Sequence, residues 1–314
     1  MRRKPVLILV LIPVFFFVLV EGVFVWREIN HLATNQAVIA SDSNYNIEDY
    51  FIIRAPEADL PFLNKEVFDA VQNIIKNYFP NNPAFVKEDG IYKIKRERET
   101  SYVGFIRFRY QKDDYNNGYV TTGLAWCTKE AGGRHMCWLS SINKHRLGSK
   151  KDFVNELRSV IRHEIFHMIF AEALSQVEGL SFAELAKGHI WLEEGVAALQ
   201  ETSGTKRYLC REQLMRNLLL NSRRRLDVNS ILSKKGSGAM FDSEMYTQSF
   251  YLAKFLIAIG GKKKLADEYF VNYYKFGQNV SVAIEKTYGK LGYHSVEDLN
   301  IAWHKWLKKE FNPK

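Results

Sequence analysis

The stretch that decides the fold is His163-Glu164-Ile165-Phe166-His167, in the middle of the chain. It lies in residues 152–174, where apolar residues recur at helical spacing. Positions four apart share one face of an α-helix, so both imidazoles point the same way and can bind one metal ion. Glu164 is one residue along, which lets its carboxylate reach a metal-bound water. The spacing therefore predicts a metal site on a helix.

The other side of this predicted helix is apolar. Leu157, Ile161, Ile165 and Met168 recur at the spacing of a buried face. We expect that face to pack into the core, which would place the two histidines on a rigid element, as a precise metal site requires.

A catalytic zinc site usually has three protein ligands and one open position for water. The stretch Trp191-Leu192-Glu193-Glu194-Gly195-Val196-Ala197 follows the two histidines and begins another helical pattern. With His163-Glu164-Ile165-Phe166-His167 it resembles the two motifs of the gluzincin-type zinc metallopeptidases, a peptidase-MA-like family. Adjacent helix positions are about 100° apart, so Glu193 and Glu194 cannot both face the metal.

The resemblance implies a zincin-like fold and assigns roles to particular residues. The glutamate directly before Gly195 becomes the third ligand, so His163, His167 and Glu194 would hold Zn²⁺. Glu164 would act as the catalytic base on a zinc-activated water. Glu201 would orient the ring of a ligand histidine without binding the metal itself. Tyr246 would donate to the oxyanion, with Tyr251 as a rival for that role.

The family likeness also implies that substrate backbone pairs with a strand at the edge of a sheet. The candidate strand is residues 135–141. Aminopeptidase members carry a Gly-x-Met-Glu-Asn-type segment at this place, and this chain has none. We therefore expect a peptide or protein substrate and slightly favour an endopeptidase.

The first residues resemble an export signal. Met1-Arg2-Arg3-Lys4 precede a nearly uninterrupted apolar run that reaches Trp26. A basic start before an apolar run is typical of a signal peptide or signal anchor. We expect residues 1–27 to be an uncleaved single-pass anchor with its N-terminus inside, which places the remaining chain on the extracytoplasmic side. The alternative is a secreted or periplasmic protein after signal cleavage.

The rest of the chain is predicted to be α+β. Residues 28–48 are polar and are interpreted as a stalk, and residues 49–314 as the metallopeptidase domain. Within that domain, residues 49–150 form a sheet-bearing half and residues 151–314 a helical half. The following ranges list the expected strands (50–54, 91–95, 103–110, 119–127 and 135–141) and helices (65–78, 152–174, 190–202, 207–220, 243–259, 262–276 and 296–311).

Composition narrows the class of protein further. With 46% hydrophobic residues in 314, the chain can bury a sizeable core. Its net charge of +9 favours anionic surfaces as neighbours, but no nucleic-acid-binding module is found and no nucleic-acid partner is expected. Three cysteines do not make a disulfide scaffold. Cys127 and Cys137 could face each other across a hairpin, and Cys210 is interpreted as a buried residue on a helix.

Two further hypotheses of function remain beside the zinc peptidase. One is a catalytically inactive zincin-fold protein that binds or assembles envelope components, although a purely structural metal site has no use for Glu164. The other is a surface-binding protein that uses its basic clusters. Substrate identity and oligomeric state are not predicted.

Overall fold

The computed structural model describes residues 42–47, 51–56, 60–95, 104–109, 123–127, 135–140, 150–175, 191–201, 203–221, 227–233 and 243–311. The chain divides into two compact units, Met1–Ser43 and Asn44–Lys314. The predicted anchor, residues 1–27, lies outside the described residues. Within the described part, none of the helices combines the length and the apolar character that crossing a membrane requires.

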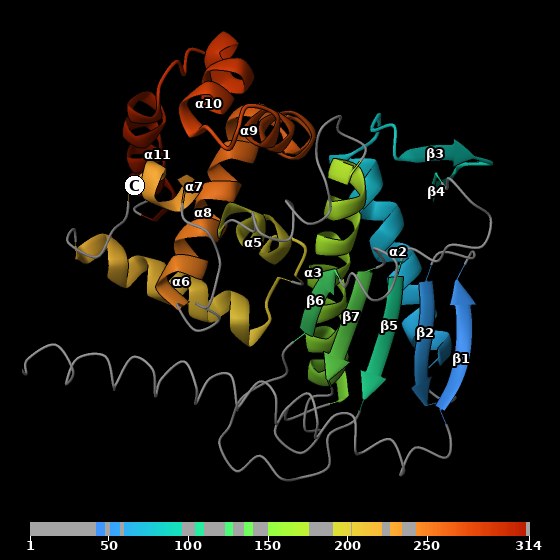
Figure 1. Ribbon diagram of the computed structural model, residues 1–314. Helices are drawn as coiled ribbons and strands as arrows, with labels where there is room; N and C mark the ends of the chain where they lie inside the picture. Colours follow the sequence, from blue (N-terminus) through green and yellow to red (C-terminus); the bar gives the residue numbers. More distant parts are fainter. Residues whose placement is uncertain are drawn as a thin grey trace, which may run out of the picture. The chain divides into compact units, whose positions relative to one another are not determined.

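A five-stranded sheet forms the first half of the described chain, with strand order β1-β2-β5-β7-β6 (Figure 1). β2 (Phe51–Pro56) runs parallel to β5 (Gly104–Arg109), and β5 runs parallel to β7 (His135–Ser140). β6 (Gly123–Cys127) lies antiparallel to β7. The sheet is therefore mixed.

Two features of the sheet differ from the prediction. β1 (Asp42–Ile47) occupies one edge, although these residues were expected to belong to the stalk. β7 was expected at an edge but is hydrogen-bonded to β5 on one side and β6 on the other, so β6 is the edge strand at that end. Strand order depends on where the chain returns to the sheet, and strand periodicity carries no information on that.

Helix α2 (Leu60–Tyr78) connects β2 to the later strands and starts five residues before the predicted start. Pro61 lies in its first turn, where a backbone N–H is not needed, so the proline is tolerated there. A small hairpin follows, made of β3 (Phe85–Glu88) and β4 (Ile91–Ile94). Its two-residue turn, Asp89-Gly90, has positive φ at both positions (50° and 85°), which is the backbone that Asp-Gly favours in such turns.

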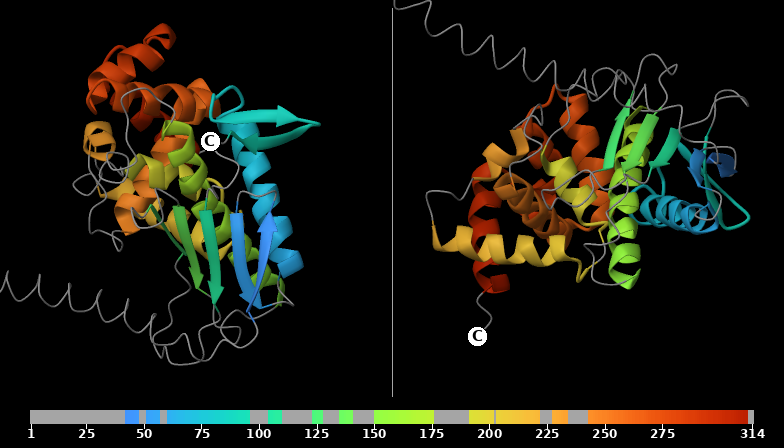
Figure 2. Two further views of the ribbon diagram at one scale, coloured as in Figure 1. Left: turned by 45° about the vertical axis from the view of Figure 1, so that its right-hand side comes forward. Right: turned by 90° about the horizontal axis from the view of Figure 1, so that it is seen from below.

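The helices α2 and α3 (Lys150–Ser175) pack against each other and against the sheet (Figure 2). α2 contacts β2, and α3 contacts β6 and β7. α3 therefore lies beside the edge strand β6, which brings the His163–His167 helix next to that end of the sheet.

The second half is helical, so the described residues form a helix-rich fold in which the strands precede most helices. Its helices are α5 (Trp191–Ala198), α6 (Lys206–Leu220), α7 (Val228–Ser233), α8 (Ser243–Gly260), α9 (Phe270–Lys275), α10 (Val280–Tyr288) and α11 (Val296–Phe311), with a π-helix η4 (Lys264–Tyr269) and a 3₁₀ turn η5 (Gly289–Leu291).

Local signals for the ends of helices are confirmed. Gly261 follows α8 with φ of 85°, a conformation that glycine adopts without steric cost. Ser295 and Asp298 form the expected capping box: the Ser295 N–H donates to Asp298 Oδ2 (2.9 Å), and the Asp298 N–H donates to Ser295 Oγ (3.1 Å). The segment predicted as one helix over 262–276 contains the π-helix η4 before α9. The short helices α7 and α10 were not predicted.

Candidate metal centre

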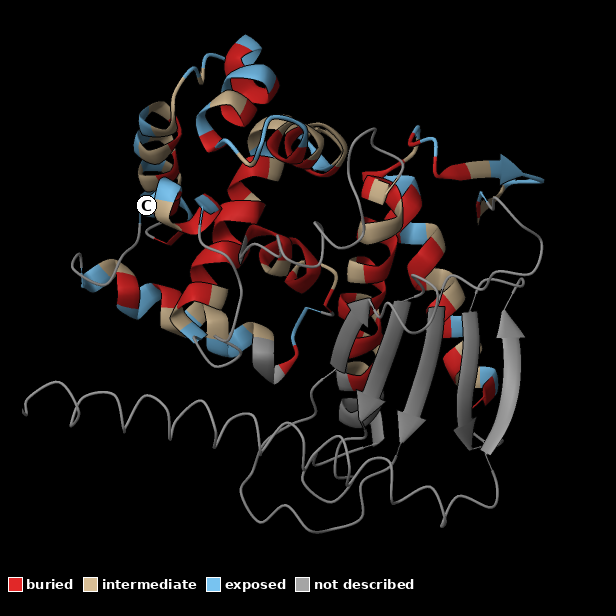
Figure 3. Ribbon diagram, viewed as in Figure 1, coloured by how far each residue is buried: buried red, intermediate tan, exposed pale blue. Residues whose placement is uncertain are grey.

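α3 is held on several sides, which fixes the direction of its histidines. Ile161, Ile165 and Met168 are almost fully buried, as expected, and Figure 3 shows buried positions along most of the described part of the helix. On α2, the buried carboxylate of Glu66 accepts a hydrogen bond from Arg158 Nε of α3 at 2.6 Å. His163 retains 8% and Glu164 6% of their accessible surface. The polar groups of the motif are thus set into a packed environment.

α5 approaches α8 very closely, and Gly195 is the residue that permits it. A Cβ atom at Gly195 would lie 2.2 Å from the backbone oxygen of Ser249 and 2.5 Å from the carbonyl carbon. Such contacts are far below van der Waals separation. The glycine directly after Glu194 therefore sets how closely α5, and the carboxylate it carries, lies against the rest of the site.

Three side-chain atoms from α3 and α5 converge on one point. His163 Nε2 lies 3.3 Å from His167 Nε2 and 3.3 Å from Glu194 Oε2, and His167 Nε2 lies 3.6 Å from Glu194 Oε2. The three residues form a group that could hold a metal ion. Tetrahedral zinc with bonds of about 2.0–2.1 Å separates its ligand atoms by about 3.3–3.4 Å. The spacing of these atoms matches that geometry.

Glu201 orients the ring of His163. The two are 3.1 Å apart between Nδ1 and Oε1, and because an ionised carboxylate only accepts, Nδ1 carries the proton and Nε2 is left as the lone-pair donor. Arg211 of α6 binds the same carboxylate twice, through Nη1 to Oε2 (2.7 Å) and Nη2 to Oε1 (2.9 Å). Arg211 was not singled out in the sequence.

Glu193 orients the ring of His167. Its Oε1 lies 2.7 Å from His167 Nδ1, which again directs the proton to Nδ1 and the lone pair of Nε2 toward the shared point. Glu193 was not expected to bind the metal, and its contact with His167 was not predicted from the sequence. Adjacent positions on a helix point in different directions, so Glu194 can face the metal point while Glu193 reaches the far side of the imidazole.

Tyr246 enters the site from the first turn of α8. Its hydroxyl donates to Glu194 Oε2 at 2.5 Å. Burial and the charge of Glu194 both raise the pKa of Tyr246, so the phenol stays protonated and remains a donor. Tyr251, the rival for this role, is buried, and its ring packs against Phe250 and Phe311.

The electrostatics of the site favour a cation. Burial lowers the pKa of His167, but the charge of Glu194 and the hydrogen bond with Glu193 raise it to about 10. Burial raises the pKa of Glu201, but the hydrogen bond with His163 and the charge of Arg211 lower it to about 2. The carboxylates therefore concentrate negative charge around the two imidazoles, and a divalent metal ion would supply the positive charge that protons otherwise supply.

The three cysteines differ from the predictions made for them, two in pairing and one in burial. Cys127 is opposite His135 and Cys137 is opposite Ala125, so the two are diagonal rather than facing neighbours on β6 and β7. Diagonal positions are about 7–8 Å apart, beyond the usual reach of a disulfide. Cys210 lies on α6 as expected, but it is exposed and not buried, because α6 turns that side of the helix to solvent.

A comparison with protein families identifies the superfamily of this chain. A family model of the Peptidase MA superfamily matches residues 123–309, from β6 into α11, which is 187 of 314 residues. The chain belongs to this superfamily, which indicates a peptidase of the metal-dependent type. No curated protein matches the chain, and no solved structure does.

Proposed function

We propose that this chain is a zinc-dependent peptidase with a zincin-like fold, in which His163, His167 and Glu194 bind the metal. The observation that carries the proposal is the near-equal spacing of the three ligand atoms, at 3.3, 3.3 and 3.6 Å. Membership of the Peptidase MA superfamily supports the class of reaction.

Glu164 and Tyr246 are the proposed catalytic residues. Zinc, when bound, supplies Lewis acidity toward a water molecule and toward the scissile carbonyl. Glu164 follows His163 on the same helix, and its buried carboxylate would take the proton of the attacking water and return it to the leaving amine. Tyr246, a protonated donor beside Glu194, would donate to the carbonyl oxygen as negative charge develops there.

β6 is the proposed support for an extended peptide substrate. It pairs with β7 on one side, no described strand pairs with its other side, and it contacts α3. An extended chain added to that edge would bond mainly through its backbone, which suits cleavage within a peptide rather than recognition of a terminal amine. We therefore propose endopeptidase action.

The proposed location is the extracytoplasmic side of a membrane. The support is the basic start and the apolar run up to Trp26 in the sequence. Peptides or proteins outside the membrane would then be the substrates, and the N-terminal segment would hold the enzyme at the surface.

Digestion of a peptide library by the purified full-length chain tests the proposal. We expect cleavage that is lost with a chelator, restored by zinc, and reduced about 100-fold or more in Glu164→Gln. The matched control is Glu172→Gln, about 12 Å further along the same helix, which should cleave normally. A wild-type chain that binds zinc but cleaves nothing would support the inactive binding protein instead, and equal cleavage by both variants would remove Glu164 from the mechanism.

A further inference from the structure

The Arg211 side chain lies largely buried beside the candidate metal centre and is held there by contacts outside its own helix. α6 begins after Thr205, whose Oγ1 accepts from the Tyr208 N–H at 3.4 Å. One turn later the Arg211 side chain, 12% exposed, binds a Glu201 side chain that is 1% exposed. Its guanidinium also lies over the ring of Phe250, 5.6 Å from the centroid. Planar packing and two parallel hydrogen bonds hold the guanidinium in one orientation.

A buried ion pair of this kind seldom adds net stability, because both charges lose their hydration. The pair has a second consequence, because Glu201 Oε1 accepts from both Arg211 Nη2 (2.9 Å) and His163 Nδ1 (3.1 Å). The position of the guanidinium thus determines where that oxygen lies, and the oxygen determines the direction of the imidazole.

We propose that Arg211 is a positioning residue for the metal centre: it fixes the Glu201 carboxylate so that His163 keeps its proton on Nδ1 and presents Nε2 to a divalent metal. This inference rests on the proposed zinc site. It concerns one histidine of the two, since His167 is oriented from α5 by Glu193.

Substitution of Arg211 has two opposing effects on zinc affinity, so the direction of the measured change is informative. Removing a positive charge near a metal ion strengthens metal binding by reducing repulsion. Removing a group that orients a ligand weakens it, and the loss of such outer partners typically costs about 10- to 100-fold in metal affinity. If Arg211 positions Glu201, the second effect must exceed the first.

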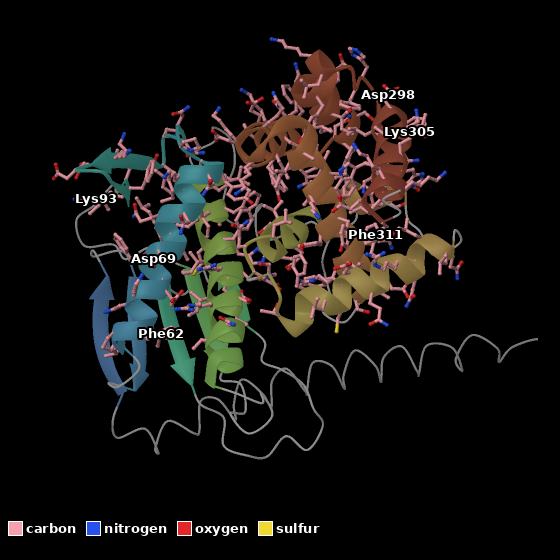
Figure 4. The ribbon with its side chains drawn as sticks, turned by 180° about the vertical axis from the view of Figure 1, so that it is seen from behind. Phe62, Asp69, Lys93, Asp298, Lys305 and Phe311 are labelled. Carbon is pink, nitrogen blue, oxygen red and sulfur yellow. The ribbon has the colours of Figure 1, made fainter. Side chains whose placement is uncertain are left out.

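The chain offers a closely matched control on the same helix. Arg216 donates to Glu212 at 2.8 Å and lies over the ring of Phe311, 5.2 Å from the centroid, at the end of α11 (Figure 4). Arg216 also combines a carboxylate and an aromatic ring, but 51% of its side chain and 38% of the Glu212 side chain are exposed. Its other hydrogen bond goes to the Phe311 backbone oxygen and not to a residue of the metal site.

The experiment measures zinc affinity of the full-length chain by competition with a chromogenic chelator. We expect about tenfold weaker binding in Arg211→Met, partial recovery in Arg211→Lys, and no change in Arg216→Met. In a Glu201→Gln background, Arg211→Met should add no further loss. In the zinc-bound chain, the ¹⁵N signals of the His163 ring should shift in Arg211→Met while those of His167 stay in place. The His163 signals are assigned by their loss in His163→Gln.

The outcomes separate this inference from the proposed function. A wild-type chain that binds no zinc removes both. Three outcomes overturn the role of Arg211 and leave the zinc site standing. They are zinc binding in Arg211→Met that equals or exceeds wild type, unchanged ¹⁵N signals of His163, and a full additional loss in the Glu201→Gln background. Arg211→Lys retains the buried charge and provides the same tests where Arg211→Met does not fold.

Discussion

Replacing Gly195 with alanine should destabilise the protein, although alanine favours helix more than glycine does. The new Cβ would lie 2.2 Å from the Ser249 oxygen and 2.5 Å from its carbonyl carbon. These atoms belong to the backbone of α8, so relief requires moving one helix by about 1 Å. Overpacking costs up to about 3 kcal/mol, and the helix propensity of alanine returns about 1 kcal/mol. We expect a net loss of about 2 kcal/mol.

Thermal unfolding followed by circular dichroism measures this loss, which corresponds to a midpoint lower by about 4–8 °C. Because α5 also carries Glu194, zinc affinity should fall as well. The matched control is Gly292→Ala, where φ is 89° and no atom lies within 4 Å of the new Cβ. Its cost should be about 1 kcal/mol of backbone strain, with zinc affinity unchanged. A Gly195→Ala protein as stable as wild type would refute the close packing of α5 on α8.

Three further outcomes are expected from other parts of the structure. Glu193→Ala should weaken zinc binding by about tenfold or more, because it removes the acceptor of His167 Nδ1; chelator competition with unchanged affinity would contradict this. Ser295→Ala should lower the free energy of unfolding by about 1 kcal/mol, because it removes the acceptor of the Asp298 N–H. Urea denaturation measures this loss, and a midpoint equal to that of wild type would contradict it. Burial raises the pKa of Asp267 above its ordinary 3.8, so the folded state binds this proton more tightly than the unfolded state does. Stability should therefore fall as pH rises from about 3.8 through the raised pKa of the folded state. Asp267→Asn should remove that fall, and a pH profile of urea midpoints that is the same in wild type and variant would contradict this.

The metal-ligand helix could be read from the sequence because its information is local. Four-residue spacing places His163 and His167 on one face whatever the helix packs against, and the apolar positions of the same helix are buried as their period indicates. The capping box of α11 and the glycine that ends α8 are equally local, since each depends on neighbours within one turn.

Contacts between distant elements could not be read in this way. Nothing in the strand patterns distinguishes the interior strand β7 from the edge strand β6, because both are short and mostly apolar and their order depends on the path of the chain between them. Arg211 and Arg216 are the same residue type on one helix, yet only Arg211 meets Glu201, and the difference lies in how α6 is placed.

The sequence by itself indicated which residues can form the site: spacing pointed to the two histidines and Glu164, and the resemblance to the second family motif pointed to the glutamate before Gly195. For His163, Glu164 and His167, residue type and spacing are sufficient because helix geometry is the same in every fold. Only the tertiary structure decided how they are held, with Glu193 on one imidazole, Glu201 and Arg211 on the other, and Gly195 against α8. These contacts join segments that the chain brings together only when the core is packed, so no spacing along the sequence encodes them.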